Sequence, residues 1–217
     1  MSNQPMVIVH HLADSRSQRI LWLLEELELP YLVRRYERDK RTFLAPAALA
    51  KIHPLGKSPM VEIDGRVLIE SGAITEYLVA TGGDRLKPTG VQERLRYRLF
   101  LHYAEGSLMP PLLTMLALRR LGLFGWPARP TIQRLIDQQL GWLDGELGRR
   151  PWFAGNEFSA ADIMMSFPLE AARDRAGLDE KRVRLWDWLA RIQARPAYQA
   201  ALGSGGSYRY AVSPKRG

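Results

Sequence analysis

The stretch from Gly56 to Gly72 constrains the fold of this chain more than any other part of the sequence. Two short apolar runs, 60–63 and 67–69, flank the dipeptide Asp64-Gly65, which is the strongest short signal for a tight β-hairpin turn. Pro59 stands directly before the first run, where a strand tolerates the missing N–H and where an X-Pro bond can be cis. The sequence therefore predicts a β-hairpin that begins directly after a proline.

The residues on either side of this hairpin offer two ways to hold a peptide-like ligand. Ser58 would present its backbone at an open edge before the first strand. At the other end, Glu70 and Ser71 leave the second strand and open an apolar-periodic helix, with Ser71 as its N-cap. The N–H groups and the dipole at the start of such a helix attract a carboxylate. We therefore expect an unpaired backbone edge at Ser58 and an anion site at Ser71.

The spacing of these features is similar to that of a known protein family. The cytosolic glutathione transferases have a thioredoxin-like domain whose glutathione-binding half resembles the pattern Lys57-Ser58-Pro59, Asp64-Gly65 and Glu70-Ser71-Gly72-Ala73-Ile74. The resemblance extends from Val7 to about Tyr198 and is closest to a theta-like branch of bacterial and fungal members. It implies that Ser58, before a cis Pro59, pairs with the cysteinyl backbone of glutathione. It also implies that Glu70 and Ser71 hold the γ-glutamyl carboxylate.

Composition narrows the classes of function. The 217 residues contain no cysteine, which excludes disulfides, thiolate metal sites and a cysteine nucleophile. The net charge is +8, but the 31 Lys and Arg residues are scattered along the chain, so we expect no nucleic-acid partner. No apolar run has the length of a membrane span and no signal-peptide pattern opens the sequence, so we expect no membrane partner and a cytoplasmic location. Since neither a His-Glu-x-x-His pair nor a Gly-rich phosphate loop is present, we also expect no metal.

The first 80 residues alternate strand and helix signals. Val7–Val9 is a β-branched run typical of a buried strand, and Tyr31–Val33 is a second one. Between them, the apolar residues from Ile20 to Leu27 recur with the spacing of one helix face. Strand, helix and strand with short joints predict a parallel βαβ unit, and a short helix over 47–52 precedes the hairpin. Together these elements predict a thioredoxin-like α+β domain over residues 1–80, with the order βαβ-α-ββα.

The remainder of the chain predicts helices. Residues 81–90 are dense in helix-breaking residues and are typical of a linker. Long helical patterns over 91–202 predict an all-α helical bundle domain, in which the Pro110-Pro111 pair kinks or breaks the first helix. The tail over 203–217 is first rich in Gly and Ser and then basic and aromatic, and we expect it to be flexible or to fold back as a lid.

A strong helix-start signal lies between Phe158 and Ile163. Ser159 as N-cap and Asp162 three residues later form a capping box, and Phe158 and Ile163 occupy the two positions of a hydrophobic staple. This motif resembles the one at the buried helix of the transferases' second domain. We therefore assign it a role in folding rather than in catalysis.

A glutathione transferase has to ionise the thiol of glutathione, because an unperturbed thiol has a pKa of about 8.5. A hydroxyl donor and the positive end of a helix dipole near the sulfur would favour the thiolate. The resemblance implies that this hydroxyl lies in the loop after the first strand, where the sequence has serines but neither cysteine nor tyrosine. Ser15 matches the catalytic serine of the theta and delta classes, and the alternatives are Ser17, backbone amides or Arg16. Ser15 and Gln18 also fit a capping box, so helix capping is a second interpretation of Ser15.

The resemblance implies further site residues. Lys57 corresponds to a lysine that pairs with the glycyl carboxylate or a backbone carbonyl of glutathione in theta-like members. Glu105 aligns with an acidic residue that reaches the glutathione amino group across the dimer interface, so we expect a homodimer. The expected pocket for a hydrophobic electrophile lies between the Ser15 loop and the first bundle helix. Its candidate lining residues are His11, Tyr103, Ser107, Leu108 and Pro111.

These expectations describe a homodimeric glutathione transferase that uses Ser15 to lower the pKa of bound glutathione. Its co-substrates would be hydrophobic electrophiles, and glutathione peroxidase activity is a further expectation. The alternative is a transferase-like module that binds glutathione, hydrophobic ligands or a protein partner without turnover, in stress response or translation. The two interpretations differ at Ser15, because a binding module requires the glutathione cradle but no activated thiolate.

Overall fold

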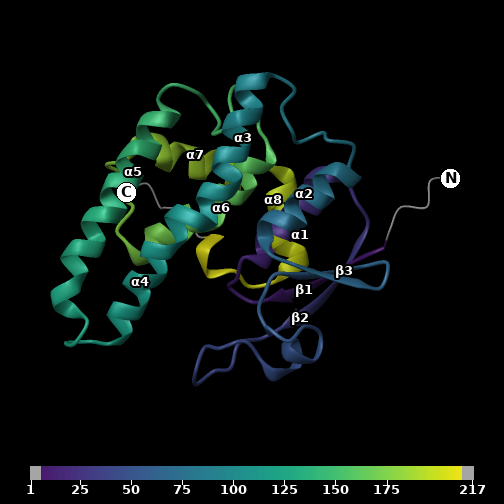
Figure 1. Cartoon of the computed structure of the whole chain (residues 1–217), viewed down its shortest axis with the longest axis horizontal. Coiled ribbons are helices and arrows are strands. Elements are labelled where there is room, and N and C mark those ends of the chain that lie inside the picture. Colours follow the sequence, from purple (N-terminus) through teal and green to yellow (C-terminus); the bar gives the residue numbers. More distant parts are fainter. Residues whose placement is uncertain (1–5, 212–217) are drawn as a thin grey trace. The chain divides into compact units, whose positions relative to one another are not determined.

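The structure is a computed structural model that describes residues 6–211. The described chain divides into two compact units, one formed by residues 6–86 with 194–211 and the other by residues 87–193 (Figure 1). No helix within residues 6–211 combines the length and the apolar character needed to cross a membrane. The expected tail over 203–217 is described only as far as residue 211, and its last six positions lie outside the described residues.

The first unit contains a four-stranded sheet in the order β2-β1-β3-β4 (Figure 1). The strands are β1 (Val7–Leu12), β2 (Tyr31–Tyr36), β3 (Met60–Ile63) and β4 (Arg66–Ile69). β1 runs parallel to β2 and antiparallel to β3, and β3 and β4 form the predicted hairpin. Asp64 and Gly65 both have positive φ, 48° and 74°, which a two-residue hairpin turn of this kind requires. The sheet confirms the predicted thioredoxin-like α+β class.

Helices cover this sheet. α1 (Ser17–Leu27) and α2 (Ser71–Thr81) are the two predicted helices, and the short predicted helix is the 3-10 turn Ala47–Lys51. α8 (Pro196–Gly205) joins the same unit because it packs on α1, with the Trp22 and Tyr198 rings edge to face at 5.1 Å. The Arg195 guanidinium donates two hydrogen bonds to the Glu26 carboxylate on α1. The contacts therefore group residues 194–211 with the sheet, whereas the helical domain was expected to extend to residue 202.

The second unit is the predicted all-α unit. Its helices are α3 (Val91–Tyr103), α4 (Met109–Arg120), α5 (Arg129–Leu147), α6 (Ala160–Arg175) and α7 (Val183–Gln193). A π-helical turn, Ala104–Leu108, separates α3 from α4. Pro110 and Pro111 have no N–H to donate to the carbonyls of the preceding turn, which explains why the regular helix is interrupted here and resumes with both prolines in the first turn of α4.

α6 begins with the predicted capping box. The Asp162 carboxylate accepts hydrogen bonds from the backbone N–H and the hydroxyl of Ser159, at 3.1 Å each. It also accepts from the Phe153 N–H at 3.0 Å and from the Trp188 ring N–H at 3.2 Å. The capping box is confirmed, and Asp162 additionally ties the loop before α6 and helix α7 to this helix start.

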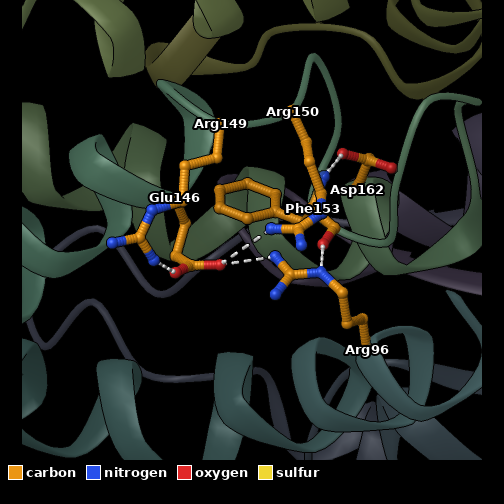
Figure 2. Close-up of polar contacts among 6 residues, drawn as sticks. All are labelled: Arg96, Glu146, Arg149, Arg150, Phe153 and Asp162. Carbon is orange, nitrogen blue, oxygen red and sulfur yellow. Dashed lines mark hydrogen bonds and ion pairs between the residues drawn. The ribbon is translucent and has the colours of Figure 1, made fainter. Parts of the chain in front are cut away.

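An ion cluster centred on Glu146 links α3 and α5 within the second unit (Figure 2). The buried Glu146 carboxylate lies 2.6 Å from an Arg96 nitrogen, 3.0 Å from Arg149 and 3.8 Å from Arg150. Arg96 also donates to the Phe153 carbonyl, and the Phe153 N–H donates to Asp162 (Figure 2). The start of α6 and the α3–α5 contact are therefore joined by one chain of polar contacts.

Candidate functional site

Three serine hydroxyls meet near the start of α1: Ser15 in the loop after β1, Ser17 as the first residue of α1, and Ser58 before β3. The Ser15 hydroxyl oxygen lies 2.8 Å from that of Ser17 and 3.1 Å from that of Ser58, and it accepts a hydrogen bond from the Ser17 N–H at 3.2 Å. Ser15 and Ser17 are both buried. Ser15 lies at the start of α1, where the positive end of the helix dipole favours negative charge. The structure thus brings both predicted catalytic serines together with Ser58.

The Ser17 hydroxyl has partners on every side. It accepts a hydrogen bond from the Leu12 N–H at 3.2 Å, lies 2.8 Å from Nδ1 of His11, and lies 3.4 Å from the Leu12 carbonyl oxygen. His11 is the second-last residue of β1 and is buried, so its contact with Ser17 is internal to this unit. Burial, followed by the positive charge of Arg35, lowers the pKa of His11 to about 4. His11 is therefore a neutral imidazole at physiological pH.

Ser58 precedes the hairpin, and the Ser58–Pro59 peptide bond is cis. Ser58 takes no part in the β1–β3 register, which begins at Met60. Lys57 is exposed next to it. The backbone role of Ser58 stays a prediction, and the contact of its hydroxyl with Ser15 was not predicted from the sequence.

The buried side chain of Arg19 contacts the start of α2. An Arg19 guanidinium nitrogen donates to the Ser71 hydroxyl at 3.1 Å, and both side chains are buried. Glu70, directly before the helix, is exposed and has φ of 69°, which is uncommon for a residue with a side chain. The contact between Arg19 and Ser71 was not predicted from the sequence. An arginine among the apolar residues of a helix face does indicate a buried partner for its charge.

Two predicted helix caps are not formed. Ser71, predicted as an N-cap, is the first helical residue, and Glu70 occupies the cap position. Arg16 occupies the cap position of α1. The Ser15 hydroxyl oxygen therefore accepts a hydrogen bond from the Ser17 N–H and not from the Gln18 N–H. The side-chain amide of Gln18 forms no hydrogen bond with any described residue. The capping-box interpretation of Ser15 is therefore wrong, because Ser15 lies one residue too early for that geometry.

The remaining predicted residues lie in the second unit. Tyr103 ends α3 and donates a hydrogen bond to the Gln139 side chain at 2.9 Å, and burial raises its pKa to about 12. Glu105 and Ser107 lie in the π-helical turn, Leu108 ends that turn and is buried, and Pro111 lies in the first turn of α4. As lining residues of an electrophile pocket, or as a dimer contact in the case of Glu105, they stay predictions.

Among residues 6–211, no group of three or more histidine or carboxylate side chains is arranged to hold a metal ion. The polar groups of the first unit, namely hydroxyls, a guanidinium and helix-start N–H groups, are instead suited to carboxylates and to a developing negative charge.

Comparison with known proteins gives a consistent family assignment. The family model described as the glutathione S-transferase N-terminal domain matches residues 4–80, and the model of the C-terminal domain of the same family matches residues 117–191. Glutathione S-transferase 3 of Schizosaccharomyces pombe is 38% identical over 213 residues, which span 90% of this chain and 86% of that protein. Glutathione S-transferase 1 of Saccharomyces cerevisiae is 33% identical over 223 residues, spanning 91% of this chain and 94% of that protein.

Solved structures agree with these sequence matches. A glutathione S-transferase from Actinobacillus pleuropneumoniae superimposes with a TM-score of 0.85 at 26% identity, covering 97% of this chain and 98% of that one. Ure2p in complex with glutathione superimposes with a TM-score of 0.78 at 18% identity, covering 93% of this chain and 100% of that one. At the lower identity the likeness concerns the fold alone.

Proposed function

This chain belongs to the glutathione S-transferase family, and we propose that it is a serine-type enzyme that ionises glutathione with Ser15. The thiol proton leaves to solvent, and the resulting thiolate attacks a carbon of a hydrophobic electrophile. A carbon–sulfur bond forms while the bond from that carbon to a leaving group breaks, as the carbon–chlorine bond of a nitroaryl chloride does when chloride departs with the electron pair. The proposed cellular setting is detoxification in the cytoplasm. Reduction of organic peroxides is a further part of the proposal: the thiolate breaks the O–O bond and an alcohol is released, and a second glutathione converts the resulting sulfenic acid to glutathione disulfide and water.

The contact between Ser15 and Ser58 carries this proposal. The two hydroxyl oxygens lie 3.1 Å apart, and Ser58 is the residue expected to pair with the cysteinyl part of glutathione. A cysteinyl group held along the Ser58 backbone would bring its sulfur near the Ser15 hydroxyl. A hydroxyl donor at the start of α1 would then stabilise the thiolate by a hydrogen bond and by the helix dipole.

The rest of the proposed cradle follows from the start of α2. The first N–H groups of a helix have no intrahelical acceptor, and the buried Arg19 adds positive charge beside Ser71. These groups would hold the γ-glutamyl carboxylate. The positive φ of Glu70 supports a functional role, because backbone strain of this kind collects at ligand-binding sites. Lys57 is exposed and would pair with the glycyl carboxylate.

A homodimer is part of the proposal. Val91, Leu95 and Leu99 recur every four residues along α3, and all three are exposed apolar side chains. Such a stripe on one helix face marks a surface that another protein covers. We propose a second copy of this chain as the partner, with Glu105 reaching the glutathione of that copy. Tyr103, Ser107, Leu108 and Pro111 are proposed to line the electrophile pocket.

Glutathione binding without turnover is the second candidate. The cradle around Ser58, Glu70 and Ser71 does not depend on the Ser15 hydroxyl. The fold is shared with Ure2p in complex with glutathione, and that complex shows that this fold holds glutathione in a protein that is not named a transferase. The two candidates differ in whether the bound thiol is ionised.

The test compares Ser15→Ala and Ser17→Ala with the wild type, using glutathione and a nitroaryl chloride. We expect Ser15→Ala to lower kcat/KM by about 100- to 1000-fold, because it removes a donor to the developing charge. Glutathione affinity, measured by calorimetry, should change little. The control is Ser166→Ala, which removes another buried serine, one that donates to the Ile163 carbonyl in α6. Full activity of Ser15→Ala would contradict the proposal, and glutathione binding without turnover by the wild type would favour the second candidate.

A further inference from the structure

The turn between α4 and α5, residues 121–128, carries large apolar side chains that the second unit leaves uncovered (Figure 1). Their exposed fractions are 57% for Leu121, 89% for Leu123, 94% for Phe124 and 68% for Trp126. A single exposed leucine is common on a protein surface, but several large apolar side chains gathered in one short turn mark a surface that binds something. We call these four residues the apolar tip.

The backbone of this turn is held by specific contacts. The Arg129 guanidinium donates to the carbonyls of Leu118 and Gly122, at 3.1 Å and 3.0 Å. Gly125 packs directly on the end of α4, because a Cβ at this position would lie 2.0 Å from the Leu118 carbonyl oxygen. Because backbone contacts define the turn, the side chains of the apolar tip are left available to another surface.

Positive charge surrounds the apolar tip. The sequence has no acidic residue between positions 105 and 137, and it has four arginines there: Arg119, Arg120, Arg129 and Arg134. Three of them are exposed, and Arg129 is partly exposed. None of the four forms an ion pair with another described residue. The charge of this α4–α5 segment is therefore not balanced within its own stretch of chain.

The neighbouring elements do not supply the missing negative charge. α4 packs on α6, where the Arg119 guanidinium donates to the Asp174 carbonyl at 3.3 Å. The residues on both sides of Asp174 are arginines, so the last turn of α6 adds no net negative charge. Asp137, the first acidic residue after the turn, already pairs with Arg182 at 3.0 Å. A partner of the apolar tip should therefore be both apolar and anionic.

The surface of an anionic phospholipid bilayer has this combination. Trp, Phe and Leu side chains bind at the boundary between the headgroups and the acyl chains, and arginines beside them are attracted to the lipid phosphates. The high exposure of Leu123 and Phe124 also favours a bilayer. A fluid bilayer closes around a projecting side chain, whereas a protein partner would need a preformed pocket for each one.

We propose that the apolar tip inserts into the surface of bilayers that contain anionic phospholipids, where Arg119, Arg120 and Arg134 pair with the phosphates. We expected no membrane partner because the chain has no apolar run of spanning length. Binding at the surface of a bilayer requires no such run. This function is separate from the chemistry proposed for Ser15 and does not rest on it.

The test is cosedimentation of the full chain with vesicles of phosphatidylcholine, either alone or with about one-third phosphatidylserine. We expect the wild type to bind the anionic vesicles, and added salt should weaken binding because it screens the attraction. Phe124→Ser should weaken binding about tenfold, since a large apolar side chain no longer leaves water. Arg120→Ser should weaken it about fivefold, because one cation near the anionic surface is lost.

Two matched controls separate the apolar tip from general properties of the surface. Val183→Ser changes another exposed apolar residue, which lies between two arginines at the start of α7. Arg66→Ser removes an exposed arginine at the start of β4, so it lowers the net charge by as much as Arg120→Ser does. Both controls should bind the anionic vesicles within about twofold of the wild type.

Four results overturn this proposal, and each leaves the proposed function standing. The first is a wild type that does not sediment with the anionic vesicles. The second is wild-type binding in both Phe124→Ser and Leu123→Ser. The third is an equal loss in Arg66→Ser and Arg120→Ser, which would show adsorption by net charge alone. The fourth is a lower mass of Phe124→Ser than of the wild type in light scattering without lipid, which would make the apolar tip a contact between copies of this chain.

Discussion

At the scale of single residues, Asp162 shows a buried carboxyl group under two opposing influences. Burial raises its pKa to about 6, against hydrogen bonds from Phe153, Ser159 and Trp188 that favour the ionised form. An ordinary aspartate has a value of 3.8, which applies to the unfolded chain. Between about pH 4 and pH 6 the folded chain therefore retains a proton that the unfolded chain has released. The free energy of unfolding has to fall as the pH rises through this window, and this group adds no further change above it.

We predict that Asp162→Asn removes this pH dependence. Relative to the variant, the wild type should lose up to about 3 kcal/mol of unfolding free energy between pH 4 and pH 6, because the shift is about two pKa units. The variant should be less stable overall, since its NH2 group meets the Ser159 donors. Urea unfolding at several pH values measures both effects. If the free energy of unfolding changed with pH in the same way in the wild type and in the variant, the account would be contradicted. The control is Asp174→Asn, which changes an exposed carboxylate of α6.

At the scale of elements, local sequence signals explain most of what was predicted. The hairpin depends on two adjacent residues with positive φ, and the start of α6 depends on residues three positions apart, so both can be read from short stretches. The packing of α8 on α1 joins segments that lie far apart in the chain, and no local pattern carries that information. The identity of one side chain also does not show which residue it contacts. The contacts of Arg19 with Ser71 and of His11 with Ser17 are examples.

One buried carboxylate contributes strongly to the contact between α3 and α5. Glu146 is only 6% exposed and Arg96 is 19% exposed, so the ion pair between them lies largely out of water. We predict that Glu146→Gln lowers the free energy of unfolding by roughly 2–4 kcal/mol, because Arg96 loses its countercharge in a shielded position. Urea unfolding at neutral pH checks this value.

The control for this substitution is Asp137→Asn, which breaks the pair of Asp137 and Arg182 between α5 and the segment before α7. Asp137 is 49% exposed, so solvent screens this pair and its loss should cost less than about 1 kcal/mol. Equal losses in the two variants would show that the burial of Glu146 adds nothing to the stability of the second unit.

At the scale of the whole molecule, the exposed stripe on α3 predicts self-association. Leu95 lies at the centre of the stripe and is 66% exposed. We predict that the wild type is a dimer and that Leu95→Asp shifts it to a monomer, because a carboxylate would have to lose its water in an apolar interface. Light scattering after size-exclusion chromatography measures the mass. Leu123→Asp is the matched control, because Leu123 is 89% exposed in the loop between α4 and α5 and should leave the dimer intact. A monomeric wild type would contradict the proposed role of Glu105 as well.

The most direct test of the central claim is a thiolate absorbance titration of glutathione bound to the wild type and to Ser15→Ala. The account predicts a bound-thiol pKa at least about one unit below the free value of about 8.5 in the wild type. It predicts a return toward the free value in Ser15→Ala, with glutathione still bound. A bound thiol with the same pKa in both proteins would show that the Ser15 hydroxyl does not ionise glutathione, and the account of this site as a serine-type transferase would be wrong.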